Sequence, residues 1–203
     1  MNKPSTLHNL GLLGVGIVAY ICAFPISFSD SAWLISLASP VWILIYLLPL
    51  LYYLKQNPSK SFLRIWLFFF LGSMGALHWI VISMRNYGNL SWSVSFAALV
   101  GTCLFRSLFP ALAIYLWHRL HRRTNMWALG AILMTLQDLL LHYIPFGGFP
   151  WLSAGYALTP DLLWIQAADM IGIHGLNITI YLVVFLLRFA LTATEKTRAL
   201  SLK

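Results

Sequence analysis

Six long apolar segments divide this chain, and the cationic residues that flank them fall almost wholly on one side. The segments cover residues 7–24, 32–54, 62–83, 92–117, 126–144 and 163–187. If the chain crosses a membrane at each segment, every Lys and Arg except Arg85 and Arg106 lies at the segment ends that share the side of the N-terminus. Short loops rich in Lys and Arg remain in the cytoplasm. The pattern therefore predicts an all-α bundle of about six transmembrane helices with both termini cytoplasmic.

The composition agrees with a membrane protein. Hydrophobic residues make up 60% of the chain and charged residues only 9%, which is too apolar for a soluble domain. A spanning helix needs roughly 20 apolar residues, and each segment supplies about that many. We therefore expect residues 1–203 to form a single transmembrane domain. The net charge of +8 lies at helix ends, so it indicates contact with lipid headgroups and predicts no nucleic-acid partner.

Two features of the first half affect the segment count. Lys3 followed by an apolar run resembles a signal peptide, but Tyr20 and Phe24 suit a cleavage site poorly, so we expect a retained helix. The second segment contains Pro40 and Pro49, which should kink or break it because proline lacks a backbone donor.

The connection between the last two segments, residues 145–156, carries the most specific pattern in the chain. Gly147 and Gly148 allow backbone angles that other residues avoid, and Pro150 restricts the next turn. Trp151 and Tyr156 are rings that favour the membrane interface. These residues predict a sharply defined interfacial loop.

Several polar side chains lie within or next to apolar segments. Asp138 and His142 share one helix face at a spacing of i and i+4, which suits either a proton-handling pair or a hydrogen-bonded pair that fixes helix packing. Arg106 needs a partner, and Asp138 is the candidate. Asp169 could cap a helix or turn at the start of the sixth segment.

No pattern of His, Cys, Asp and Glu has the spacing of metal ligands, so we expect no metal and no cofactor. Cys22 and Cys103 lie in different apolar segments and have no basic neighbour in sequence, so we expect both to pack as small apolar side chains. His78 and Trp79, at the outer end of the third segment, could line a lipid-facing cleft.

The loop and the residues after it resemble the apolipoprotein N-acyltransferase family of bacteria. The family has a Gly-Phe-Pro-Trp block followed by Gly-Tyr, which correspond to Gly148-Phe149-Pro150-Trp151 and Gly155-Tyr156. It then has a Gln, an Ala-Asp pair and two spaced glycines, which correspond to residues 166–175 here. Where the family commonly has a Glu and an Arg before the loop, this chain has Asp138 and Leu141.

The resemblance implies a location and a function. It implies a multi-pass protein of the bacterial cytoplasmic (inner) membrane that takes part in lipoprotein maturation, with phospholipid and diacylated prolipoprotein as partners. In the family an acyl chain passes from phospholipid to an enzyme Cys and then to the amino group of a diacylglyceryl-cysteine. The Glu, Lys and Cys for that chemistry belong to a nitrilase-like domain that residues 1–203 do not contain. Whether this chain is itself an enzyme therefore stays open.

Three functional hypotheses follow. The chain is a membrane scaffold or subunit for a separate nitrilase-like catalytic polypeptide, with no catalytic residue of its own. Alternatively, it is a catalytically silent paralogue that binds lipid or lipoprotein. A third hypothesis, from another class, is a small membrane transporter with a polar pathway formed by Asp138, His142 and Arg106.

Overall fold

The computed structural model describes residues 6–24, 40–56, 58, 60–124, 126–145 and 147–201. Expectations that involve Lys3, residues 32–39, Phe146 and Lys203 lie outside these ranges. The described elements are α1 (Thr6–Cys22), α3 (Pro40–Ile45), α4 (Leu47–Lys55), α5 (Ser61–Ala76), α6 (Trp79–Asn86), α7 (Trp92–Thr124), α8 (Trp127–Leu141), the 3-10 helix η1 (Ala154–Leu158), α9 (Leu162–Ile165) and α10 (Ala168–Ser201). The described part of the chain is helical and contains no strand, as the sequence predicts.

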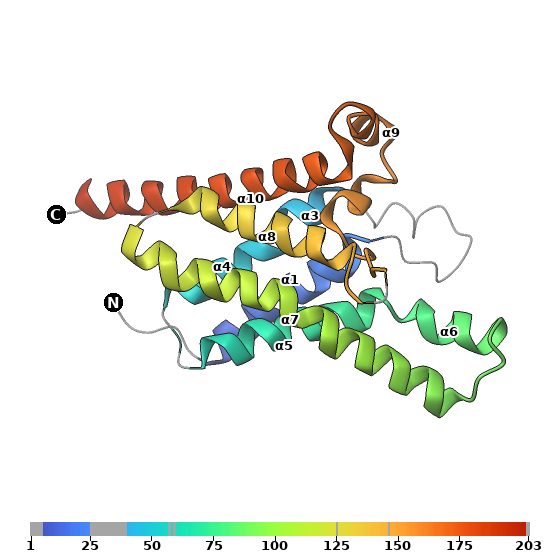
Figure 1. Cartoon of the computed structure of the whole chain (residues 1–203). Coiled ribbons are helices and arrows are strands. Elements are labelled where there is room, and N and C mark those ends of the chain that lie inside the picture. Colours follow the sequence, from blue (N-terminus) through green and yellow to red (C-terminus); the bar gives the residue numbers. More distant parts are fainter. Residues whose placement is uncertain are drawn as a thin grey trace.

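The long helices run side by side along one axis (Figure 1). α7 packs against α5 on one side and α8 on the other, α8 packs against α10, and α1 packs against α4 and α5. The start of α5 and the end of α10 lie at the left end in Figure 1, which we call the basic end. α6, α9 and the loop after α8 lie at the opposite end, which we call the loop end.

The helices vary in their capacity to span a membrane. Among the described residues, Trp92–His121 and Ala168–Ala193 are long and apolar enough to cross, and α5 and α6 become a third candidate if they form one span with a 44° bend. Three shorter apolar helices, Leu7–Cys22, Val41–Lys55 and Trp127–Leu141, coincide with the other predicted segments. Six spans and cytoplasmic termini therefore stay predictions.

Breaks in the helices follow local chemistry. The second predicted segment divides at Tyr46, and Pro49 lies in the first turn of α4, where a missing N–H costs little. The break that Pro40 and Pro49 predict is therefore confirmed. The sixth segment begins differently from the prediction. Residues from Leu162 form the separate short helix α9, and Gly172 interrupts α10 with φ 66° and ψ 176°.

An aromatic cluster fills the core between α1, α4 and α5. The rings of Tyr20 and Tyr46 stack with their centroids 5.0 Å apart, and Phe69 meets Tyr20 edge-on at 6.1 Å. Gly72 makes this packing feasible, because a Cβ there would lie 2.2 Å from the Tyr20 ring. The glycine thus lets α1 approach α5 closely.

Candidate functional site

The loop after α8 makes a tight turn at its two glycines. Gly147 and Gly148 have φ values of 96° and 105°, which glycine adopts far more easily than other residues. A Cβ on Gly148 would lie only 1.9 Å from the carbonyl oxygen of His142. The turn closes where the Phe149 N–H donates to the carbonyl of Leu141 at 2.7 Å. The sharp turn predicted from the sequence is confirmed.

Arg106, from the middle of α7, binds the main chain of this loop. Its side chain is buried, with Nε donating to the carbonyl of Trp151 and Nη2 to that of Leu152, both at 2.9 Å. Nη1 donates to the hydroxyl of Tyr20 at 3.1 Å. The planar guanidinium suits two adjacent carbonyls because its donors point in fixed directions. The hydrogen-bond partners of Arg106 are therefore the loop backbone and the Tyr20 hydroxyl, and Asp138 binds another part of the same loop.

Asp138 accepts hydrogen bonds on both carboxylate oxygens. Oδ1 accepts from Nε2 of Gln137 at 2.6 Å, and Oδ2 accepts from the hydroxyl of Tyr181 on α10 at 2.9 Å. The N–H of Ala154 donates to Oδ2 across 3.4 Å. The buried carboxylate lies near enough to Arg106 for the two charges to interact. Opposite charges from α7 and α8 thus contact successive parts of one loop.

Asn177 of α10 adds a third contact with the loop. Its Oδ1 accepts from the N–H of Gly155 at 2.7 Å, and its Nδ2 donates to the hydroxyl of Ser153 at 2.7 Å. Gly155 permits this approach, since a Cβ there would lie 2.5 Å from Ile173 and 3.0 Å from Asn177 Oδ1. We call Arg106, Asp138 and Asn177 the loop clamp. They come from three helices and bind the main chain of residues 151–155, so loop and bundle form one unit.

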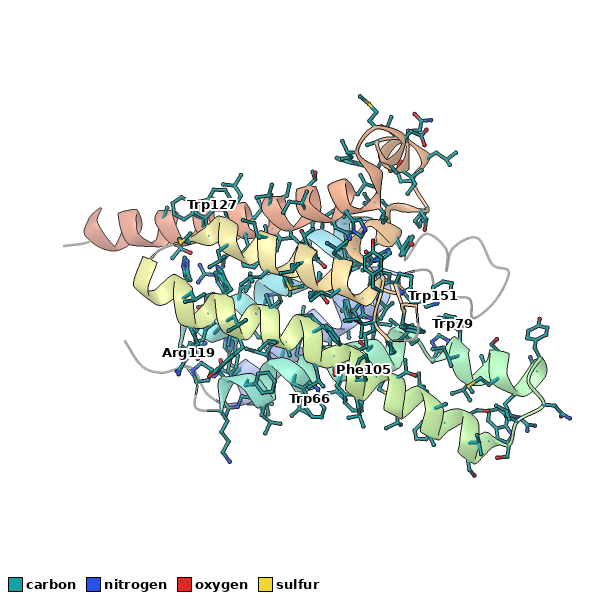
Figure 2. The ribbon with its side chains drawn as sticks, viewed as in Figure 1. Trp66, Trp79, Phe105, Arg119, Trp127 and Trp151 are labelled. Atoms are coloured by element: carbon teal, nitrogen blue, oxygen red, sulfur yellow. The ribbon has the colours of Figure 1, made fainter. Side chains whose placement is uncertain are left out.

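The clamped loop forms one wall of a half-open cavity of about 540 Å³, which we call the tryptophan groove. Figure 2 shows Trp79 and Trp151 facing each other there, and their rings meet edge-to-face with centroids 5.2 Å apart. The groove is lined by Phe24, Ala76, Leu77, Trp79, Pro150, Trp151, Leu152, Tyr156 and Thr159. It therefore unites four residues that the sequence placed in a lipid-facing site, namely Trp79, Pro150, Trp151 and Tyr156.

The remaining candidate residues lie outside the groove lining. Phe149 borders a separate cavity of about 260 Å³ beside Arg106. His78 Nδ1 donates to the carbonyl of Gly75 at 2.8 Å, at the bend between α5 and α6. Asp169 is exposed in the first turn of α10.

His142 does not pair with the Asp138 carboxylate. Its Nδ1 donates to the backbone carbonyl of Asp138 at 2.8 Å, and its ring lies edge-on to His174 at 4.6 Å. The spacing of i and i+4 therefore brings the ring to the main chain of Asp138, while the carboxylate contacts the loop. This geometry gives a structural contact and supplies no direct proton path between the two side chains.

The two cysteines of the chain lie in different helices, α7 and α1. Cys103 is buried in α7 and Cys22 is partly buried at the end of α1, and no hydrogen bond to a histidine or carboxylate is found for either thiol within the described ranges. An acyl-enzyme needs a thiol with a base at hydrogen-bond distance. The same ranges contain no group of three His, Cys, Asp or Glu residues that could hold a metal ion.

Several residues that take part in the clamp's contacts were not predicted from the sequence, among them Gln137, Tyr181, Asn177 and Tyr20. Asn177 lies in an apolar run, and an amide at membrane depth needs a hydrogen-bond partner, so its position alone could have marked it. Tyr20 carries no such signal, because a tyrosine in an apolar helix usually packs as a large, mostly apolar side chain. Its role depends on Gly72, which is far from it in sequence.

Comparison with known proteins identifies relatives of the chain. A family model described as the apolipoprotein N-acyltransferase N-terminal domain matches residues 16–186. The apolipoprotein N-acyltransferase of Geobacter metallireducens is 33% identical over 134 residues, which are 63% of this chain and 25% of that protein. That of Nitrosomonas europaea is 31% identical over 139 residues, which are 67% of this chain and 28% of that protein. The chain therefore spans about a quarter of the length of these relatives.

Proposed function

Because the chain belongs to the apolipoprotein N-acyltransferase N-terminal domain family, we propose that it is a membrane module of lipoprotein maturation whose tryptophan groove receives an acyl chain. The acyl chain comes from a phospholipid donor or from the diacylglyceryl-cysteine of a prolipoprotein. The module lies in the bacterial inner membrane as about six spans, with the basic end in the cytoplasm and the loop end on the outer side.

The observation that carries this proposal is the loop clamp. It fixes Trp151 and Leu152 through their carbonyl groups, so their side chains stay available to form the groove wall. A groove wall that is held before the ligand arrives lowers the entropy lost on binding. The clamp is buried and polar in an apolar bundle, and such groups are costly without hydrogen-bond partners. Its place next to the groove supports a lipid-binding role for that end of the molecule.

We propose further that the acyl-transfer chemistry belongs to a nitrilase-like domain outside residues 1–203. Neither described cysteine has the base that a thiol nucleophile requires. In this proposal the membrane module presents the lipid and the nitrilase-like domain attacks it. Trp151 is 52% exposed and Leu163 of α9 is 78% exposed, which leaves apolar surface at the loop end for lipid and for that domain.

Photo-crosslinking tests the groove. The chain is reconstituted into nanodiscs with a phospholipid that carries a diazirine at the end of one acyl chain, irradiated, and mapped by peptide mass spectrometry. We expect the label to concentrate on two peptides, one containing Trp79 and one containing residues 151–159. Labelling spread evenly over the apolar helix surfaces would contradict the proposal.

A matched pair of variants sharpens this test. Thr159 is exposed at the groove, and its hydroxyl donates to the carbonyl of Tyr156 at 2.9 Å. Thr179 is exposed on α10 away from the groove and makes the same kind of bond, to Gly175 at 2.8 Å. Thr159→Phe should reduce labelling of the groove peptides, whereas Thr179→Phe should leave it unchanged. Equal labelling in both variants would refute occupation of the groove.

A further inference from the structure

A second concave surface lies at the basic end, far from the tryptophan groove. It is a groove of about 530 Å³ between α1, α4 and α5, and we call it the basic groove. Its walls are mostly apolar, and its lining includes Leu13, Ile17, Leu67 and Leu71. The polar part of its lining is Asn9, Tyr53 and Arg64.

The polar and apolar parts of the basic groove are separated along the helix axis. Asn9 lies in the first turn of α1, Tyr53 near the end of α4 and Arg64 in the first turn of α5, so all three lie at the basic end. Ile17 and Leu71 lie about two turns further along their helices, roughly 10–12 Å toward the middle of the bundle. The groove therefore has a cationic mouth and an apolar floor.

The cation at the mouth is held in place. Arg64 Nη1 donates to the hydroxyl of Tyr53, and its guanidinium lies 5.7 Å from the centre of the Tyr53 ring. No described carboxylate forms an ion pair with Arg64. Lys60, one helical turn earlier in sequence, is also exposed and adds positive charge at the same end. The mouth thus offers a positioned positive charge to an anion.

We propose that the basic groove binds one anionic phospholipid, with its phosphate at Arg64 and one acyl chain along the apolar floor. The separation of charge and apolar surface matches that of a phospholipid, and a charged headgroup gives the selectivity, because apolar walls alone do not distinguish one lipid from another in a bilayer. The site differs in place and charge from the tryptophan groove, and it does not depend on the proposed function.

Native mass spectrometry of the detergent-solubilised chain, titrated with dioleoylphosphatidylglycerol, tests the site. We expect one lipid to bind more tightly than dioleoylphosphatidylcholine. Arg64→Gln should weaken phosphatidylglycerol binding about fivefold, the contribution expected of one cation near anionic lipid. Arg119→Gln removes the same charge from the same end on α7 and should leave binding unchanged, since Arg119 does not line the groove. Equal weakening by both variants would overturn the site.

Two glycines of α1 provide a steric test with its own control. A Cβ on Gly14 or on Gly11 would meet no atom within 4 Å, so both helix surfaces have room for a larger side chain. Only Gly14 lines the basic groove. Gly14→Leu should weaken binding at least as much as Arg64→Gln, because its side chain occupies the groove, whereas Gly11→Leu should not.

Glycerol 3-phosphate separates a lipid site from a site for free phosphate. It carries the phosphate without an acyl chain, so we expect no competition with phosphatidylglycerol at equal concentrations. Competition that depends on Arg64, or equal affinity in the Gly14→Leu and Gly11→Leu variants, would overturn the proposal of a bound lipid.

Discussion

Replacing Asn177 with leucine tests the loop clamp most sharply, because leucine keeps the size of the side chain and removes both hydrogen bonds. The two bonds, to Gly155 and Ser153, measure 2.7 Å each, and Asn177 is fully buried. The variant leaves the Gly155 N–H and the Ser153 hydroxyl without their partner. An orphaned buried group costs about 1–3 kcal/mol. The hydroxyl can rotate toward other acceptors, so we expect Asn177→Leu to lower the free energy of unfolding by about 2–4 kcal/mol.

A double-mutant cycle with Ser153 separates the two bonds. Ser153→Ala removes the hydroxyl, so Asn177→Leu in that background orphans only the Gly155 N–H. The cost of Asn177→Leu should then fall by about 0.6–1.7 kcal/mol, the coupling seen for side-chain hydrogen bonds in membrane proteins. The difference measures the bond between the two side chains.

Denaturant titration in detergent micelles, followed by the circular dichroism of the helices, gives these free energies for the four proteins of the cycle. The loop clamp would be refuted if Asn177→Leu cost less than about 0.5 kcal/mol, well under the cost of one orphaned N–H. It would also fail if that cost were the same with and without the Ser153 hydroxyl.

Two further predictions concern the same loop. Gly148→Ala should destabilise the protein far more than Gly147→Ala in the same titration. Both glycines have positive φ, but only a Cβ on Gly148 meets the His142 carbonyl. Equal effects of the two substitutions would mean that backbone strain alone matters. Tyr181→Phe should lower the free energy of unfolding by about 1 kcal/mol, because it removes a 2.9 Å hydrogen bond to Asp138. The carboxylate keeps its bonds from Gln137 and Ala154. No measurable loss would show that the bond from Tyr181 adds no stability.

The helices were largely predictable, because the lengths of the apolar segments and the positions of the prolines indicate where helices lie and where they break. Each of the six predicted segments coincides with a helix or a helix pair within the described residues. The bend between α5 and α6 was not predictable, since no proline marks it. The separate helix α9 was also missed, because Leu162 and Leu163 continue the apolar pattern of the following span. The positive φ of Gly172, which interrupts α10, is not visible in that pattern either.

The loop was predictable and its support was only partly so. Gly147 and Gly148 have the positive φ that their sequence suggests, because the turn needs residues without a side chain. Leu152 also has a positive φ, of 66°, and nothing in its sequence indicates that. Arg106 was expected to pair with Asp138, whereas its hydrogen bonds are made to two loop carbonyl groups and to the Tyr20 hydroxyl. Patterns in sequence reveal that a buried charge needs a partner but do not reveal a backbone partner brought in by a distant loop.

An acyl-transfer assay tests most directly the claim that this module binds lipid and leaves the chemistry to another domain. Residues 1–203 are mixed with phospholipid and a diacylglyceryl-cysteine lipopeptide, and the lipopeptide is weighed by mass spectrometry. The full-length apolipoprotein N-acyltransferase of Geobacter metallireducens serves as the reference enzyme. We predict no change in the mass of the lipopeptide with residues 1–203. A gain of one acyl chain that disappears in Cys22→Ala or Cys103→Ala would contradict the account.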